Sequence, residues 1–246
     1  MSRRSGSGAD DRTAHPAFDT IADRYDLLNR LLSLGLDRSW RRQAVRAVPP
    51  QGGESVLDVC AGTGDLTLEV WRTGLARRVI GLDRSPSMLA LARSKSPRAG
   101  GPEYVLGDAL SLPFPDADFD LVTIGFGLRN LPDRTTAIRE IQRVLRPGGR
   151  LLVLEFCPPG PGLWAGVAAW YLNTIVPALG AAFGRHPESY RYLRESVNGF
   201  PPPAVLRDEL EAAGFAKVGW RLLWPGLVAY HHASRPLATR SDHKQS

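Results

Sequence analysis

Small and acidic residues follow three successive apolar runs of the sequence, at positions where a nucleoside could be bound. Gly62 and Gly64 come after the first run, Asp83 ends the second, and Asp108 ends the third. Glycines let a ligand lie against the backbone, and a carboxylate placed like Asp83 can accept both hydroxyl hydrogens of an adenosine ribose. A short acid such as Asp108 can accept a hydrogen bond from the exocyclic amine of adenine. Together these residues predict a cofactor that contains adenosine.

These residues do not by themselves identify which adenosine-containing cofactor is bound. Enzymes that bind nicotinamide dinucleotides also place an acid where Asp83 stands, but the third glycine of their fingerprint would fall at Thr67. An adenosine without phosphates does not need that close approach of the helix. Taken singly, the glycine pair could be a structural turn and Asp83 a helix cap before Ser85. The combination at three strand ends disfavours a purely structural interpretation.

A loop at residues 126–130 holds the next candidates, Arg129 and Asn130. An arginine beside an asparagine at a sheet edge could hold an oxyanion or a bridging water. The alternative is an ordinary solvated loop arginine. The Asn-Pro-Pro tetrad of many N-methyltransferases is missing here, so an exocyclic nitrogen is disfavoured as the acceptor.

Alternating patterns predict the elements that must position these residues. Helical periodicity covers residues 18–34, 37–48, 65–73, 86–95, 133–145 and 203–213. Apolar, β-branched runs cover residues 55–60, 78–83, 102–108, 119–125 and 150–156. Such β-then-α units with nearly continuous apolar strands predict a parallel sheet covered on both faces. Residues 216–223 and 227–232 flank a Pro-Gly turn and predict a C-terminal antiparallel hairpin.

Residues 156–184 contain no charged side chain, and the run 163–183 is long enough to raise the question of a membrane span. Gly166 and Pro177 are among the residues that interrupt the run and disfavour a span. We expect an apolar cap insertion around 158–200 within one domain at 17–234. A buried helical pair and a cap over a substrate pocket are both compatible with this pattern.

Composition excludes several classes of protein. The net charge is +6, but between residues 17 and 234 there are 25 basic residues against 22 acidic ones, which disfavours a nucleic-acid partner. Residues 1–16 and 235–246 predict disordered tails, and the first of them has no apolar run of a secretory signal. Two cysteines cannot form a disulfide framework, so a cytoplasmic location is the default.

The two cysteines also test the expected strand order. Cys60 and Cys157 both follow parallel strands, and the fourth strand is expected to lie between these strands. Two strand spacings amount to ~9–10 Å, which is too far for a disulfide. We therefore predict that both cysteines remain thiols.

Several segments resemble the ubiquinone/menaquinone biosynthesis C-methyltransferases. They are residues 25–40, 126–130, 143–155, 189–196 and 229–231, and the similarity extends over about residues 18–235. The segments 25–40 and 126–130 are rather specific to that family, whereas the glycine motif is generic. The chain departs from the usual pattern at Leu28, Asp37 and Cys157, where Met, His and Ser are common.

The resemblance implies a class I S-adenosylmethionine-dependent methyltransferase fold, with a mostly parallel seven-stranded sheet and a C-terminal antiparallel hairpin. It also implies C-methylation of a demethylmenaquinol or a related benzoquinol. The residues that would contact S-adenosyl-L-methionine are Gly62, Thr63, Gly64, Asp83, Asp108 and Ala109. Arg129 would act on the acceptor, and Tyr190 and His231 are further titratable candidates. Because arginine stays protonated, Arg129 is expected to stabilise a phenolate or orient a water.

Alternatives stay open at this stage. A methyltransferase of the ubiquinone branch, or one acting on another apolar molecule, shares most of these features, and a non-catalytic protein could keep the fold. The arginines of residues 38–46 could contact an anionic membrane surface on its inner face, or form an ordinary solvated helix face. The oligomeric state, including a homo-oligomer, is left open by the sequence.

Overall fold

The computed structural model describes residue 33, residues 35–158, 166 and 174, and residues 195–237. The expected helix at 18–34, the N-terminal tail and nearly all of the expected cap insertion lie outside these residues. Tyr190 lies outside them as well.

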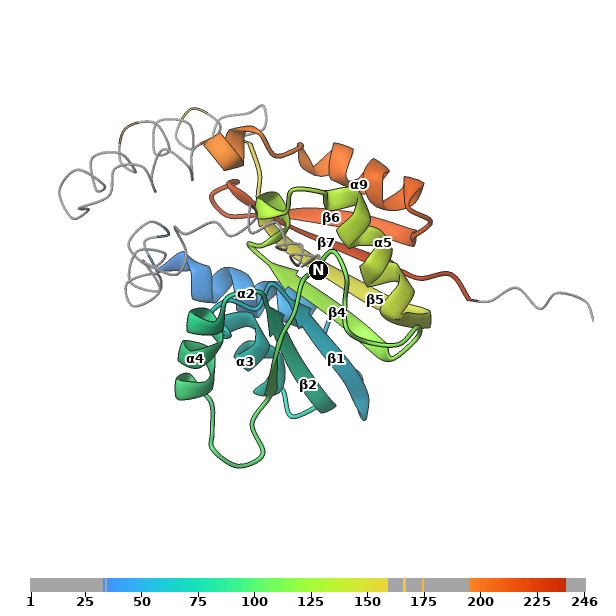
Figure 1. The fold of residues 1–246 in the computed structure, drawn as a ribbon. Helices are drawn as coiled ribbons and strands as arrows, with labels where there is room; N and C mark the ends of the chain where they lie inside the picture. The colour runs from blue at the N-terminus through green and yellow to red at the C-terminus, as the bar shows by residue number, and fades with distance from the viewer. Residues whose placement is uncertain (1–32, 34, 159–165, 167–173, 175–194, 238–246) are drawn as a thin grey trace, which may run out of the picture.

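Seven strands form one sheet in the order β3-β2-β1-β4-β5-β7-β6 (Figure 1). Their bounds are β1 Glu54–Val59, β2 Ala76–Asp83, β3 Glu103–Leu106, β4 Phe119–Gly125, β5 Leu145–Phe156, β6 Ala216–Leu223 and β7 Val228–Ser234. The first five strands pair in parallel, whereas β7 pairs antiparallel with both β5 and β6. The predicted parallel sheet with a reversed hairpin at one end is confirmed.

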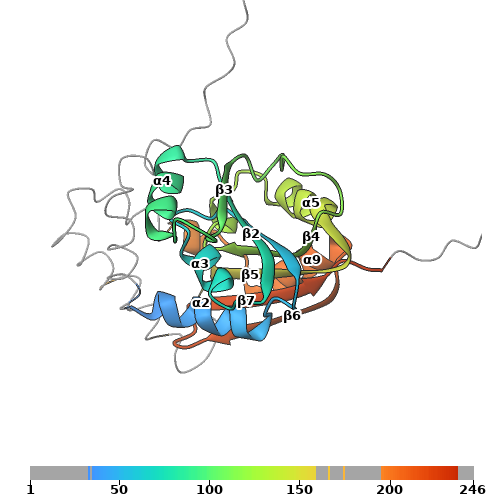
Figure 2. The ribbon, with the colours of Figure 1, turned by 90° about the horizontal axis from the view of Figure 1, so that it is seen from below.

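Helices cover both faces of this sheet (Figure 2). Their bounds are α2 Leu36–Ala47, α3 Asp65–Trp71, α4 Pro86–Lys95, α5 Arg134–Val144 and α9 Pro203–Ala212, with a 3-10 turn, η1, at Leu128–Asn130. Residues of α2 and α3 share one apolar cluster with the sheet, and residues of α5 and α9 share the other. The central strands carry buried side chains on both faces, which explains their nearly continuous apolar sequence.

The helix starts follow local rules of the sequence. Ser85 accepts a hydrogen bond from the Met88 amide and precedes a proline at the first turn of α4. Asp133 caps α5 in the same way, accepting from the Thr136 amide. The predicted helices 86–95 and 133–145 are therefore found within one residue of their expected bounds.

The C-terminal part of the chain needs one correction. Arg235 was expected to begin a disordered tail, but its amide donates to the Gly149 carbonyl and its guanidinium binds three carbonyls, those of Gln142, Arg143 and Leu145. These carbonyls end α5 and begin β5, where the helix leaves acceptors without intrahelical donors. Arg235 satisfies these carbonyl acceptors and extends the ordered chain beyond the hairpin.

Candidate active site

The turn at residues 60–64, named the cofactor turn because the sequence predicts a ligand there, joins β1 to α3 at the carboxyl end of the sheet. Gly62 has φ +55°, and a Cβ placed on it would meet no atom within 4 Å. Thr63 is buried beside it, with 4% of its surface exposed. The open space at Gly62 is the place where the predicted ligand could approach the backbone.

Gly64 serves a different purpose in this turn. Its φ is +79°, and an added Cβ would lie 2.5 Å from the Tyr104 hydroxyl oxygen and 2.9 Å from the Ala92 side chain. Tyr104 extends from β3 across Gly81, where a Cβ would lie 2.8 Å from its ring. The glycine at position 64 is thus required by the packing of Tyr104, which the sequence pattern did not reveal.

Two of the predicted acids lie at neighbouring strand ends. Asp83 ends β2, and its Oδ2 accepts from the Gly62 amide at 2.7 Å while its Oδ1 accepts from the Ser85 amide at 3.0 Å. Burial raises the pKa of Asp83, and these backbone donors oppose that rise. The Gly107 amide donates to the Asp83 carbonyl and so brings the turn of Asp108 against the same strand end.

Asp108 and Ala109 face in different directions after β3. Asp108 is exposed, and its Oδ1 accepts from the Leu110 amide at 2.9 Å. Ala109 is buried in the apolar cluster beneath α5, with 4% exposed. The structure therefore brings Gly62, Asp83 and Asp108 together, whereas Ala109 offers a ligand its backbone more readily than its methyl group.

Asp58 is a buried carboxylate that sequence reasoning missed. It lies on β1 below the cofactor turn with 1% exposed, and it accepts from the Thr67 hydroxyl at 2.6 Å and the Thr123 hydroxyl at 2.7 Å. Burial raises its pKa to about 6, and the two hydroxyls and Arg41 work against that rise. Thr67, the position at which the dinucleotide fingerprint fails, has a role of its own as a donor to this carboxylate.

Arg129 lies on the turn η1, on the β4–β5 side of the cofactor turn. Its NH1 donates to Glu155 Oε1 at 2.7 Å and to the Phe126 carbonyl at 2.6 Å, and its amide donates to Glu155 Oε2 at 3.2 Å. Glu155 is 2% exposed near the end of β5, so this is a buried ion pair. The interpretation of Arg129 as a solvated loop residue is therefore wrong, and Glu155, within the segment 143–155, is a candidate site residue for which the sequence pattern indicated no role.

The loop at residues 126–130, which includes Arg129, packs against the end of β1. A Cβ on Gly127 would overlap the Cβ of Cys60 and lie 3.2 Å from its Sγ. Cys60 and Phe126 both have left-handed backbones, with φ +56° and +59°. Such conformations are rare for residues other than glycine and persist only where neighbouring structure enforces them. The ends of β1 and β4 therefore turn away from the sheet side by side.

An aromatic cluster lies beside Arg129 and connects it to α2. Phe126 and Phe156 have ring centroids 4.9 Å apart, and the Trp40 ring lies 6.5 Å and 6.0 Å from them. Arg41 lies over the Phe126 ring at 5.6 Å and donates to Asp37 at 2.6 Å. Asp37, which departs from the family pattern, is thus neutralised by a buried partner within α2.

His231 is not brought to this edge of the sheet. It faces Val153 within the sheet and is 2% exposed, and its Nε2 lies 2.9 Å from the Pro203 carbonyl at the start of α9. Burial lowers its pKa to about 4, so the ring is neutral near pH 7. The placement supports a structural role for His231 and disfavours the catalytic role considered from the sequence.

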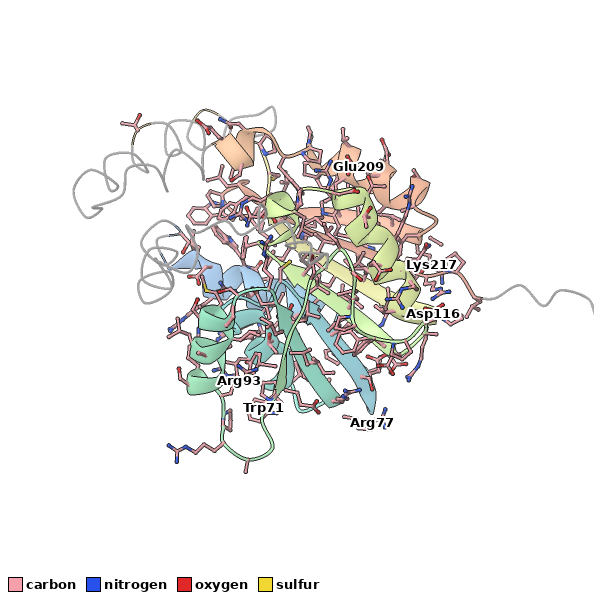
Figure 3. All side chains as sticks on the ribbon, viewed as in Figure 1. Trp71, Arg77, Arg93, Asp116, Glu209 and Lys217 are labelled. Atoms are coloured by element: carbon pink, nitrogen blue, oxygen red, sulfur yellow. The ribbon has the colours of Figure 1, made fainter. Side chains whose placement is uncertain are left out.

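Some charged residues lie at the end of the sheet opposite the carboxyl ends of its parallel strands. Arg77, Asp116 and Lys217 mark the opposite edge of the sheet in Figure 3. Within the described part of the chain, no group of three or more His, Cys, Asp or Glu residues could hold a metal ion. None of the helices formed by the described residues has the length and apolar character of a membrane span.

Comparison with known proteins decides the family. A model of the ubiE/COQ5 methyltransferase family matches residues 7–235. The chain belongs to this family. The resemblance inferred from the segments 25–40 and 126–130 is confirmed, and the predicted enzyme class is a methyltransferase.

Relatives in this family agree along nearly their whole length. A demethylmenaquinone methyltransferase of Thermus thermophilus is 46% identical over 220 residues, which is 89% of this chain and 100% of the relative. A demethylmenaquinone methyltransferase of Mycobacterium tuberculosis is 43% identical over 234 residues, which is 95% of this chain and 97% of the relative.

Solved structures support the fold at low sequence identity. A methyltransferase of Thermotoga maritima aligns with TM-score 0.65 and 17% identity over 90% of this chain and 100% of its own. The 4+2 cyclase SpnF aligns with TM-score 0.63 and 20% identity over 89% of this chain and 96% of its own. Because a cyclase shares this fold, the fold alone does not assign the reaction, and the site residues must do so.

Proposed function

We propose that this protein transfers a methyl group from S-adenosylmethionine to a ring carbon of a demethylmenaquinol in menaquinone biosynthesis. The observation that carries the proposal is the pairing of two half-sites at one sheet edge. Gly62, Asp83 and Asp108 form an adenosine-binding half on β1–β3, and Arg129 with Glu155 forms a charged, aromatic-lined half on β4–β5. The names of the curated relatives support the choice of acceptor.

The cofactor half fits an adenosine that carries no phosphate. The Asp83 carboxylate accepts from the backbone of Gly62, Ser85 and Arg84, and a carboxylate has about four lone-pair sites, so it can still accept from a ribose hydroxyl. The open space at Gly62 leaves room beside the carboxylate. S-adenosylmethionine would supply the methyl group from its sulfonium centre, and the neutral thioether S-adenosylhomocysteine would be the leaving group.

The acceptor half fits a phenolic ring. A quinol carbon attacks a methyl group better when the neighbouring hydroxyl has lost its proton, so an enzyme gains by stabilising the oxyanion. The ion pair with Glu155 and the hydrogen bond to the Phe126 carbonyl hold the Arg129 guanidinium over the Phe156 ring, 5.3 Å from its centroid. In this arrangement Arg129 stabilises the oxyanion, and the aromatic rings exclude water from the reacting carbon.

The direct experiment uses labelled S-adenosylmethionine and chemically reduced demethylmenaquinol. We expect the label on the ring carbon, located by mass spectrometry. Asp83→Asn should weaken cofactor binding, whereas Glu155→Gln should leave the cofactor Kd unchanged and lower kcat, because it perturbs only the acceptor half.

Three outcomes would overturn parts of the proposal. Cofactor binding without transfer to any quinol would refute the acceptor and direct the search to other apolar molecules. Preferential transfer to a demethylated benzoquinol would assign the ubiquinone branch. Equal loss of cofactor binding in Asp83→Asn and Glu155→Gln would refute the division into two half-sites.

A further inference from the structure

Helix α2 separates its charged residues into a buried pair and an exposed row. Arg41 is buried with Asp37, the only acid of the helix, whereas Arg38, Arg42 and Arg46 are exposed. Positions four residues apart lie above one another on a helix, so these three arginines form one stripe. Arg38 and Arg46 make no ion pair with any residue that the structure describes, and Arg42 lies 3.5 Å from Glu69 of α3.

The hairpin β6–β7 carries further exposed basic residues on the sheet face that α2 covers. Arg221 pairs in register with Tyr230, which packs against the α2 cluster, and His232 lies two residues further along the same strand. Side chains two residues apart share a face of a sheet, so Arg221, Tyr230 and His232 lie on the face covered by α2. Arg221 and His232 are exposed. Figure 2 shows β6 and β7 beside α2.

A single large aromatic residue projects at the end of this surface. Trp224 follows β6 at the tip of the hairpin and is 63% exposed. Its carbonyl accepts from the Trp40 indole of α2 at 2.8 Å, which ties the tip to the helix. Trp40 also contacts Phe126 and Phe156 at the strand ends, so the exposed tryptophan lies at the same edge as the acceptor half-site.

We propose that Arg38, Arg42, Arg46, Arg221 and Trp224 form a basic face that docks on an anionic lipid bilayer. The charge of the face complements anionic headgroups, and tryptophan favours the boundary between headgroups and acyl chains. The physiological reason rests on the proposed function, because an isoprenoid quinol resides in the bilayer. Docking through this face presents the acceptor edge to the membrane surface.

The first test measures partition onto vesicles in the absence of substrate. The wild-type protein should sediment with vesicles of phosphatidylglycerol and phosphatidylcholine at 50 mM salt, and not with phosphatidylcholine alone. The variant R38Q/R42Q/R46Q, in which three arginines are neutralised, should have a partition coefficient about a hundred-fold lower, since each basic residue near an anionic surface strengthens binding. W224A should also weaken binding, with little change in its salt dependence.

A matched control variant has the same net charge as R38Q/R42Q/R46Q. R98Q/R139Q/R207Q neutralises the exposed Arg98 after α4 and Arg139 on α5, together with the half-buried Arg207 on α9, which pairs with Asp208. It should bind vesicles like the wild-type protein. Equal losses in both triple variants would overturn the proposal, because binding would then follow net charge alone. Tight binding of single-stranded RNA at 150 mM salt, with no vesicle binding, would also overturn it and assign the face to nucleic acid.

A second test connects docking to catalysis. R38Q/R42Q/R46Q should keep the wild-type kcat/KM toward a short-chain demethylmenaquinol in solution and lose about ten-fold or more toward a long-chain acceptor embedded in anionic vesicles. If neither acceptor is methylated by the wild-type protein, the proposed function fails while the vesicle assay still decides the docking. If R38Q/R42Q/R46Q kept the wild-type kcat/KM toward the embedded acceptor as well, this result would contradict a role of docking in catalysis.

Discussion

Asp58 is enclosed by two threonine hydroxyls and lies beneath the cofactor turn. Thr67 reaches it from α3 and Thr123 from β4, so one carboxylate joins three elements that meet at the site. A buried carboxylate loses solvation when it ionises, and hydroxyl donors return only part of that energy. The result is the raised pKa of about 6.

The first prediction concerns the pH dependence that Asp58 creates. Because its pKa is higher in the folded protein than in the unfolded chain, protonated Asp58 favours folding, and this contribution is lost as the pH rises from about 4 to about 6. The stability of the wild-type protein relative to Asp58→Asn should therefore fall by on the order of 2–3 kcal/mol across that range. Urea unfolding at several pH values would measure the difference. A difference that stays constant with pH would refute the assignment.

The second prediction concerns His231. A glutamine at this position can still donate to the Pro203 carbonyl, so His231→Gln should leave the shape of the kcat profile between pH 6 and 9 unchanged. The wild-type protein loses stability as the pH falls from about 6.5 to about 4, because the unfolded chain binds a proton that the buried ring resists. The variant should lack this part of the acid sensitivity. Loss of an acidic limb in the kcat profile of the variant would instead return His231 to the catalytic residues as a general base.

At the scale of residues, sequence reasoning located candidate ligand-binding acids and missed the side chains that pack around the candidate site. Asp83 and Asp108 follow strand ends and could be recognised from spacing. Tyr104 could not be connected with Gly64, because their contact depends on how β3 lies against β1 and β2. The pairing of Glu155 with Arg129 depends in the same way on two neighbouring strand ends.

At the scale of elements, the loop 126–130 and the end of β1 fit one another closely. Gly127 leaves room for the Cys60 side chain, and the neighbouring Phe126 carbonyl accepts a hydrogen bond from the Arg129 guanidinium. Bounds of helices and strands followed from periodicity and capping, so most were predicted. The mutual fit of two loops is set by side chains 67 positions apart in the sequence, and no local pattern reports it.

The third prediction tests that fit with a double-mutant cycle. Gly127→Ala should displace the loop and lower kcat on the order of a hundred-fold, since small misplacements of positioning groups have large effects on rate. Cys60→Gly removes the opposing Cβ, so Cys60→Gly/Gly127→Ala should recover much of the lost rate. Single-turnover kinetics would separate the chemical step from binding. Additive losses in the double variant would show that the two positions do not interact.

At the scale of the molecule, the strand order keeps the two cysteines apart. β4 lies between β1 and β5, as the alternating pattern predicted, and both thiols are reduced. Burial raises the pKa of Cys157 to about 12 and that of Cys60 well above its ordinary value. Thiolates are the reactive form, so both groups are protected by their protonation, and Cys157 is protected by its burial as well.

The fourth prediction follows from this protection. The native protein should react with a thiol reagent at pH 8 at least a hundred-fold more slowly than the chain unfolded in guanidinium, which should titrate two thiols. Mass spectrometry without reductant should show no loss of two hydrogens. Rapid modification of Cys60 in the native state would mean that the end of β1 opens readily.

The position of β1 between β2 and β4 has a consequence for how such enzymes diversify. In the proposed site, the nucleoside contacts lie at the ends of β1, β2 and β3, and the acceptor contacts lie at the ends of β4 and β5. Changes in the segments 126–130 and 155–157 can therefore alter the accepted ring while the methyl donor stays the same. A library of variants with substitutions only in those segments would test new acceptors while the residues that bind the methyl donor stay unchanged.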